Sequence, residues 1–405
     1  MIPFSPPRID QRIIDEVTAA LKSGWISTGP RTKQLEKNIT AYCGNQVSLC
    51  LNSATAGLEI MLRWFGVGPG DEVVLPAYTY AATANVVMHC GATPVFADVN
   101  KEDFNISIGE IEKLISEKTK VLMPVDFGGF PCDYEAINRL AEAKKGLFRP
   151  DTENQKKLGR MLVLSDAAHS LGGSYKGKKT GCLTDVSVFS FHAVKNLSTA
   201  EGGAVALNLP APFDNKAVYD YLCIKTLHGQ NKDALAKMQR GNWKYDIIED
   251  GYKCNMTDIA AAMGLVELER YDADTLVRRK HICSHYANFF SKDKRFELPV
   301  QKTSDREASY HLFALRIHNI SEEQRDAIIQ RIFDKEVSVN VHFKPVPMMS
   351  FYKQLGYDIK NYPQAYDNFS REITLPVYYD LTDEQLNTIC AAVLNSANEI
   401  LNSKH

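Results

Sequence analysis

The sequence predicts an α/β fold in which a largely parallel sheet is covered by helices on both faces. Short apolar runs alternate with helix-length segments through the first half of the chain, and the composition changes after about residue 285. Strands connected through helices pair in parallel, and because such a sheet is buried on both faces its strands are continuously apolar. Seven runs have this character, at residues 47–51, 72–75, 93–97, 119–124, 161–165, 186–190 and 204–207. We therefore expect a seven-stranded, mostly parallel sheet followed by a small C-terminal α+β domain.

The N-terminal elements follow from periodicity and from the residues that end helices. Residues 10–23 predict an amphipathic helix whose apolar face is made of Ile13, Ile14, Val17 and Leu21. Gly24 ends this helix, and residues 24–30, GWISTGP, form a loop. Residues 146–160 are charged and poorly periodic, so we expect a surface insertion without chemistry there.

The second half of the chain predicts a different arrangement. Residues 210–250 are polar and aromatic and read as an irregular surface excursion, and a long helix follows from 257 to about 285. The remainder pairs strand-like residues 311–319 and 337–343 with helical residues 321–333 and 382–401. We expect a large domain over residues 1–250, and a connecting helix with the small domain over residues 251–405.

Composition is consistent with an ordinary soluble enzyme, and we expect a cytoplasmic protein. A formal net charge of −2 gives no polybasic signal for nucleic acid or an anionic membrane. No apolar run reaches the roughly 18 residues of a spanning helix, and the N-terminus lacks the apolar stretch of a signal peptide. The nine cysteines include no C-x-x-C pair and the ten histidines no H-E-x-x-H pattern, so we expect reduced thiols and no structural metal.

Two polar motifs follow consecutive predicted strands. In FSFHAVKNLSTAEGG, residues 189–203, Lys195 lies in the turn after a strand, and in VLSDAAHSLGG Asp166 comes at the end of the preceding strand. Strand ends that meet at one edge of an open sheet address the same ligand. Pyridoxal phosphate carries an aldehyde that suits a lysine and a pyridinium N–H that suits a carboxylate. Lys195 is therefore a candidate for Schiff-base formation; the alternative is a solvated loop lysine.

A third motif, NSATAGL at residues 52–58, opens a helix directly after the first predicted strand. Its small residues let backbone N–H groups approach an anion at the positive end of the helix. Ala54 and Thr55 are therefore candidates for binding a phosphate group. The alternative is simple N-capping of the helix by Asn52 or Ser53.

With LPAYTYAATAN at 75–85 and GYKCNMTDIAAAMGL at 251–265, these motifs resemble the DegT-type nucleotide-sugar aminotransferases, which are fold-type I enzymes dependent on pyridoxal phosphate. The resemblance runs from about Gly24 to the C-terminus, with the motifs in the family's order and about its spacing. It implies a homodimer with shared active sites.

The resemblance also implies roles for further residues around the cofactor. Tyr80, rather than Tyr78, matches the aromatic residue that stacks on the cofactor ring. His169 matches a Gln or His near the ring oxygen, and Ser190 matches a contact to the phosphate. Lys253 and Asn255 match a segment that reaches the partner's phosphate, although the family usually has N-Y-R here.

Four residues match the family's substrate site. Ser27 and Thr28 lie in the loop that helps to enclose the substrate, and His342 and Phe343 match the H-[FY] pattern that borders the sugar. For His342 and Phe343, packing within a strand is an equally weighted alternative.

The implied reaction transfers an amino group from glutamate to the keto group of a nucleotide-linked sugar. Lys195 moves the proton and Asp166 keeps the pyridine nitrogen protonated. The resemblance further implies a UDP-linked 6-deoxy 4-keto sugar, converted to its 4-amino form in surface-polysaccharide synthesis.

Three alternatives stay open. A sugar dehydratase of the same family usually replaces the lysine by His, and Lys195 weighs against it. An amino-acid-metabolising enzyme of this fold would carry an Arg for the substrate carboxylate in its small domain. A non-catalytic regulator would not need an intact site.

Overall fold

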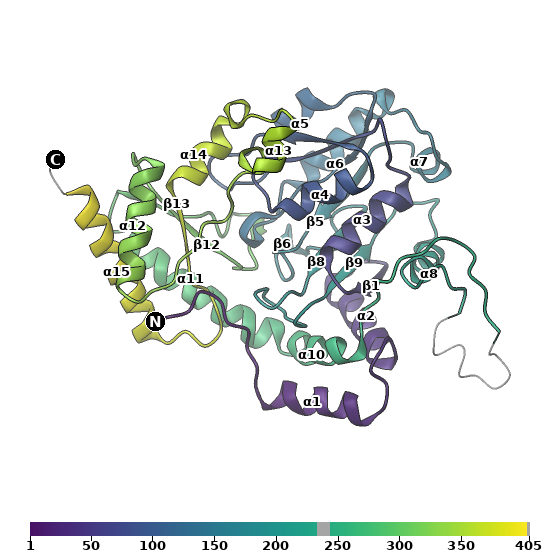
Figure 1. The fold of residues 1–405 in the computed structure, drawn as a ribbon, viewed down its shortest axis with the longest axis horizontal. Coiled ribbons are helices and arrows are strands. Elements are labelled where there is room, and N and C mark those ends of the chain that lie inside the picture. Colours follow the sequence, from purple (N-terminus) through teal and green to yellow (C-terminus); the bar gives the residue numbers. More distant parts are fainter. Residues whose placement is uncertain (233–243, 403–405) are drawn as a thin grey trace.

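A seven-stranded sheet forms the centre of the fold in the computed structural model, which describes residues 1–232 and 244–402 (Figure 1). Its strand order is β1-β9-β8-β5-β4-β2-β3, and β9 alone runs antiparallel to its neighbours. The strands are β1 Val47–Leu51, β2 Glu72–Pro76, β3 Thr93–Ala97, β4 Thr119–Leu122, β5 Leu162–Asp166, β8 Val186–Ser190 and β9 Gly203–Leu207. Each of the seven apolar runs of the sequence is a strand of this sheet, which confirms the predicted fold class.

Helices cover both faces, as the alternation of side chains along the strands requires. On one face Val205 and Leu207 of β9 pack in the larger core, and on the other Ala204 and Ala206 pack in a second core. On the first face α3 Ala54–Phe65 and α4 Ala81–His89 pack together, and Gly57 of α3 lies against Val188 and Val205. α6 Tyr134–Ala143 lies on the second face, where the Tyr134 hydroxyl is 2.5 Å from that of Ser165 in β5, with α5 Ile108–Leu114 beside it; α8 Asn215–Lys225 contacts β1. The second face is covered by α2 Pro30–Cys43 and α10 Asp258–Glu269, and α1 Gln11–Lys22 packs against α10.

The N-terminal helix and the long helix lie where the sequence predicts them, although Ile14 and Leu21 of the expected apolar face of α1 are exposed. Asp10 caps α1, because its side chain accepts the N–H of Ile13 at 3.2 Å. The predicted helix over 257–285 is interrupted by a π-turn at Tyr271–Thr275 and continues as α11 Leu276–Phe290.

The C-terminal part has its own core around a three-stranded sheet. The sheet consists of β10 Phe296–Glu297, β12 Phe313–Ile317 and β13 Glu372–Leu375. The remaining helices are α12 Glu322–Asp334, α13 Ser350–Gln354, α14 Pro363–Arg371 and α15 Asp383–Leu401. A small C-terminal α+β unit is therefore present; the division at residue 250 stays a prediction.

Two expectations from the sequence were wrong. Residues 210–250 are not an irregular excursion throughout, because they contain α8 Asn215–Lys225. Residues 337–343 are not a strand either: they make single pairings, Val337 with Ile2 and Asn340 with Thr374, and these do not join into a continuous ladder. Residues 146–160 lie mostly at the surface, as expected, but they contain the capped helix α7 Glu153–Leu158. Within it Gln155 is buried, and its amide donates to the carbonyl of Phe65 at 3.0 Å.

Candidate active site

A cavity of about 350 Å³ opens at the carboxyl edge of the large sheet. The register of the strands builds it: Leu51 of β1 pairs with Gly203 of β9, which pairs in turn with Ser190 of β8. The start of α3 and the ends of β5 and β8 therefore meet at one place. The cavity is lined by nine residues that the sequence singled out: Ala54, Thr55, Tyr80, Asp166, His169, Ser190, Lys195, His342 and Phe343.

Lys195 lies in the turn after β8, where its backbone N–H donates to the carbonyl of His192 at 2.8 Å. Burial lowers the pKa of its amine to about 8, while the nearby charge of Asp166 acts to raise it. A lowered pKa leaves more of the amine neutral near pH 7. The amine is then available as a nucleophile or as a base.

Asp166 ends β5 and is only 6% exposed. Thr83 of α4 donates to its Oδ2 at 2.8 Å, and the N–H of Ala168 donates to its Oδ1 at 3.2 Å. Burial raises the pKa of Asp166, and the two hydrogen bonds and Lys195 oppose this shift. Each carboxylate oxygen keeps a second acceptor position, so the group is able to receive a further N–H from the cavity.

The first turn of α3 is suited to an anion. Ser53 caps the helix by accepting the N–H of Ala56 at 3.1 Å, and the preceding helical N–H groups of Ala54 and Thr55 have no intrahelical acceptor. Gly203 permits this arrangement, because a Cβ at that position would lie 2.5 Å from the nitrogen of Ala54. The backbone thus presents donors to the same cavity as Lys195 and Asp166.

Two aromatic residues form the opposite wall of the cavity. Tyr80 is 64% exposed, and its ring centroid lies 5.9 Å from that of Phe343. Tyr78 is fully buried, and its hydroxyl donates to the carbonyl of His342 at 2.7 Å. Of the two tyrosines, only Tyr80 is placed to contact a ligand.

Two neutral histidines lie side by side at the inner end of the cavity, with ring centroids 4.3 Å apart. Burial, more than the nearby charge of Lys195, holds the pKa of His169 well below its usual range. Its Nδ1 accepts the N–H of Gly128 at 3.3 Å, so its proton is on Nε2. His311, which the sequence did not single out, shares the low pKa for the same principal reason, burial.

The tautomer of His311 follows from Asn196. The side-chain amide of Asn196 donates to Tyr271 and to the carbonyl of Ser309, so its oxygen faces Nδ1 of His311 at 2.8 Å and accepts a hydrogen bond from its N–H. Nε2 of His311 is therefore an acceptor. No sequence signal points to this role, because His311 simply begins a strand-like run.

Four predicted site residues lie outside this cavity: Ser27, Thr28, Lys253 and Asn255. They form a separate cluster beside the end of β1, where Asn255 pairs with Leu51 and donates to the hydroxyl of Thr28 at 2.5 Å. Lys253 is exposed and donates to Asn255 at 2.5 Å. Part of the predicted subunit-reaching segment at 210–250 lies outside the described residues. A role in a partner's site stays a prediction.

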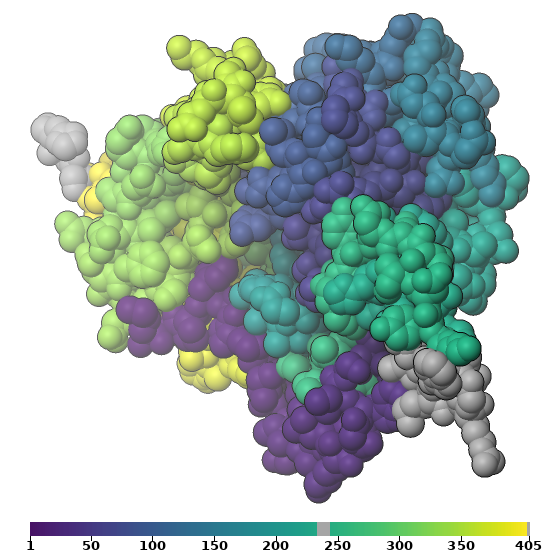
Figure 2. Space-filling model, turned by 45° about the vertical axis from the view of Figure 1, so that its right-hand side comes forward, coloured from purple at the N-terminus to yellow at the C-terminus, as the bar shows by residue number. Residues whose placement is uncertain are grey.

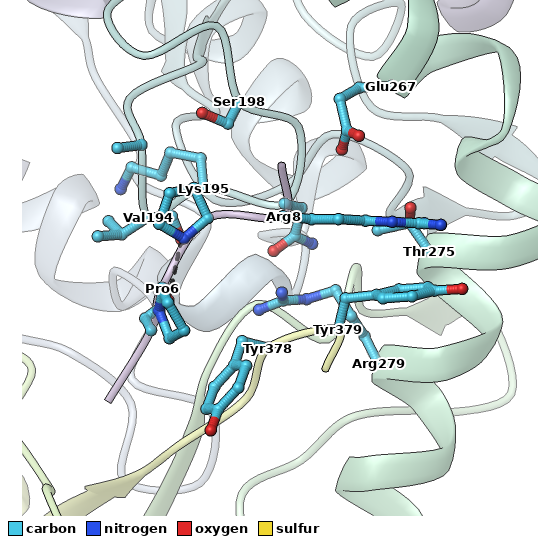
Figure 3. A pocket seen from close by; sticks show the side chains of 14 residues that line it. Pro6, Arg8, Val194, Lys195, Ser198, Glu267, Thr275, Arg279, Tyr378 and Tyr379 are labelled. Carbon is cyan, nitrogen blue, oxygen red and sulfur yellow. Dashed lines mark hydrogen bonds between the residues drawn. The ribbon is translucent and has the colours of Figure 1, made fainter. Parts of the chain in front are cut away.

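An N-terminal arm, residues 2–8, lies against the C-terminal unit, where purple and green surfaces adjoin in Figure 2. Ile2 pairs with Val337, and Phe4 stacks on His342 with centroids 5.6 Å apart. Beside Lys195 the arm encloses a second cavity of about 30 Å³, where Arg8 stacks on Tyr379 at 3.6 Å (Figure 3). The sequence did not predict that the arm contributes to the site.

A lysine and a carboxylate at neighbouring strand ends, with a helix N-terminus beside them, define a fold-type I enzyme that uses pyridoxal phosphate. The residues fit this cofactor, since amine, carboxylate and open N–H donors face one cavity. The chain belongs to the DegT/DnrJ/EryC1/StrS aminotransferase family, whose sequence model matches residues 7–394. It is a sugar aminotransferase dependent on pyridoxal phosphate.

Individual relatives agree over almost the whole chain. The spore coat polysaccharide biosynthesis protein SpsC of Bacillus subtilis (strain 168) is 36% identical over 396 residues, which cover 97% of this chain and 96% of SpsC. Spr1654 of Streptococcus pneumoniae, assigned as a sugar aminotransferase and solved in PMP and PLP forms, superposes in its PMP form with a TM-score of 0.95 at 45% identity, covering 99% of this chain and 100% of its own.

A more distant structure has the same fold. Helicobacter pylori PseC, an aminotransferase involved in the biosynthesis of pseudoaminic acid, superposes with a TM-score of 0.86 at 26% identity, covering 98% of this chain and 99% of its own. Within the described residues, no cluster of three or more His, Cys, Asp or Glu side chains is placed to hold a metal ion. None of the helices in residues 1–232 and 244–402 combines the length and apolarity needed to cross a membrane.

Proposed function

We propose that this enzyme transfers an amino group from glutamate to the 4-keto group of a UDP-linked 6-deoxy sugar, as a cytoplasmic homodimer that supplies surface-polysaccharide synthesis. The observation that carries the proposal is the convergence of Lys195, Asp166 and the first turn of α3 on one cavity in a chain of this family. The names of SpsC and PseC, which concern polysaccharide and sugar biosynthesis, support this class of substrate.

Each residue of the cavity has a role in this proposal. The amine of Lys195 binds the cofactor and, once displaced, moves a proton at the reacting carbon of donor or sugar. Asp166 keeps the pyridine nitrogen protonated, while Ala54, Thr55 and Ser190 hold the phosphate. Tyr80 stacks on the ring, and His169 donates its Nε2–H to the ring oxygen. When bound, the cofactor supplies the electron sink that the exchange of an amino group requires.

A neutral wall suits the sugar. His342, Phe343 and His311 offer aromatic faces and hydrogen-bonding atoms without charge, as hydroxyl groups require. Among the described residues that line the cavity none is an arginine, the residue that an amino-acid-metabolising enzyme of this fold would carry in its small domain. The buried arginines of the C-terminal unit have other partners: Arg316 pairs with Glu297 and Arg325 with Asp326.

The dimer rests on a separate argument. The cofactor's phosphate is a dianion, and the donors that face it from α3 and Ser190 are uncharged, so a further contact would improve its binding. We place that contact on Lys253 or Asn255 of a second copy, with Ser27 and Thr28 next to the substrate. Exposed apolar side chains near this cluster, Tyr245, Ile247 and Ile248, are suited to an interface.

The test is a panel of UDP- and dTDP-linked 4-keto sugars, each incubated with the holoenzyme and L-glutamate. We expect a UDP-linked 6-deoxy 4-keto sugar to give an amino sugar, detected by mass spectrometry, together with one equivalent of 2-oxoglutarate. Lys195→Ala is the matched control and should give neither. Loss of water from the sugar without amine transfer would favour a dehydratase, and turnover of amino acids alone would contradict the proposal.

A further inference from the structure

A buried carboxyl group stands behind the wall of the cavity. Glu372 begins β13 and is fully buried. Its Oε2 accepts the backbone N–H of His342 at 3.0 Å, and its Oε1 accepts the hydroxyl of Thr374 through a short hydrogen bond. Glu372 forms no ion pair with any described residue, so two neutral donors are the hydrogen-bond partners of its buried carboxyl group.

The hydrogen bonds continue from Glu372 to the cavity. Thr374 Oγ1 lies 3.0 Å from Nδ1 of His342, whose ring lines the cavity that contains Lys195. Two contacts fix this histidine in place: Phe4 stacks on its ring, and Tyr78 binds its carbonyl oxygen. Glu372, Thr374 and His342 therefore form one chain, which we call the Glu–Thr–His chain.

Thr374 has a single hydroxyl proton, and this couples the two ends of the chain. If Glu372 is ionised, Thr374 donates to it and must accept a hydrogen bond from the N–H at Nδ1, which leaves Nε2 of His342 as an acceptor. If Glu372 is protonated, it donates to Thr374, Thr374 donates to Nδ1, and Nε2 carries the proton. The state of the buried carboxyl thus decides which hydrogen-bonding character His342 shows in the cavity.

We propose that Glu372 and Thr374 are positioning residues that set the tautomer of His342, and so determine whether the cavity offers an acceptor or a donor to a hydroxyl or amide group of the sugar. The inference deepens the proposed function and rests on it, because it concerns the binding of that substrate. It assigns to β13 a part in specificity although β13 itself lies behind the cavity wall.

The surrounding charges allow both states near neutral pH. Burial raises the pKa of Glu372 to about 8, against the effects of Thr374, the His342 N–H, and the cations Arg325 of α12 and Arg316 of β12. Tyr78 also faces this carboxyl, and burial raises its pKa well above the usual range, so it stays neutral.

His342 itself stays neutral across this range. Burial, assisted by the charge of Lys195, lowers its pKa to about 3, and the neighbouring histidines 169 and 311 are neutral for the same main reason. The ring therefore changes tautomer rather than charge. Below about pH 8 we expect Nε2 to be a donor, and above it an acceptor.

The direct test reads the tautomer of His342 in the resting holoenzyme by NMR with ¹⁵N-labelled histidine, assigned through His342→Gln. In the native protein we expect the proton to leave Nε2 as the pH rises through about 8. Glu372→Gln should hold it on Nε2 at every pH: the His342 N–H requires the amide oxygen, so the amide NH₂ must donate to Thr374. Thr374→Val should remove the pH dependence, and Thr374→Ser, which keeps the hydroxyl, should retain it.

A kinetic arm separates this inference from the proposed function. In the native enzyme the KM for the sugar should change about tenfold as the pH rises through 8, which is the size expected for the loss of one hydrogen bond. In Glu372→Gln the KM should not depend on pH in this range. The rate of the half-reaction with L-glutamate should be the same in the native enzyme and in Glu372→Gln. The NMR experiment needs no sugar, so it still gives a result if no sugar in the panel is a substrate. A native His342 tautomer that does not change between pH 6 and 10 overturns the inference, whichever variants fold.

Discussion

Lys195 is subject to two opposing effects, and burial outweighs the charge of Asp166, so that the pKa of the amine is about 8. Only the neutral amine attacks an aldehyde. The apoenzyme should therefore capture pyridoxal phosphate about tenfold more slowly for each pH unit below 8, and at a nearly constant rate above it. Stopped-flow absorbance measures the rate, and borohydride reduction with peptide mapping identifies the lysine. A constant rate from pH 6 to 8, or a label on another lysine, would contradict the assignment.

Asp166→Asn should keep most of its cofactor, because the lysine and the phosphate contacts remain, but lose activity by orders of magnitude. A neutral amide does not stabilise the protonated ring nitrogen. The same change removes the charge that raises the pKa of Lys195, so the pH profile of cofactor capture should move to lower pH. Steady-state kinetics and cofactor content on one sample provide the measurement. A loss below about tenfold, or 1.4 kcal/mol of barrier, would show that Asp166 is not the ring partner.

At the same scale, the sequence could predict those site residues that follow strands. Lys195 and Asp166 come at strand ends, and their types match a known chemistry. Thr83 and His311 carried no such signal, because a threonine inside a helix and a histidine at the start of a strand are ordinary. Their roles arise from contacts between segments far apart in the sequence, which periodicity does not describe.

Gly203 of β9 lies against the first turn of α3, so a substitution at this position tests the contact between the two elements. In Gly203→Ala the new Cβ would meet the nitrogen of Ala54 at 2.5 Å, so β9 and α3 must separate. We expect the apoenzyme to lose about 1–3 kcal/mol of stability towards urea and its affinity for pyridoxal phosphate to fall. Gly146→Ala is the matched control, since its Cβ would meet nothing within 4 Å. Equal behaviour of the two variants would argue against a phosphate site at this contact.

Elements were predictable where burial shapes their composition. The seven strands are buried on both faces and appear in the sequence as apolar runs. Helix α2 is not predicted from the sequence, because Pro30 with its neighbouring glycines indicates a loop. Proline in fact suits the first turn of a helix, where its missing N–H is not needed. In the same way α7 is short and charged, and only its caps, Thr152 and Gly159, mark it as a helix.

Assembly is tested with two inactive variants, Lys195→Ala and the double variant Lys253→Ala/Asn255→Ala, mixed under conditions that exchange subunits. Lys253 and Asn255 lie outside the cavity of their own chain. If it acts on a partner, one site in each mixed dimer has an intact lysine and an intact partner segment, so activity should partly return. Mass spectrometry of tagged subunits checks the exchange. A mixture that exchanges but stays inactive would mean that the segment does not act across an interface.

The contacts of the N-terminal arm also determine when this part of the structure forms during synthesis. Its first residues leave the ribosome early, yet Ile2 bonds to Glu336 and Ser338, which are made much later. The wall formed by Phe4 and His342 is therefore assembled near the end of synthesis, after the large sheet has its full sequence. Any extension attached before Met1 would continue from this late-docking arm, beside the catalytic turn. An affinity tag is better placed after α15, at the far end of the C-terminal unit (Figure 1).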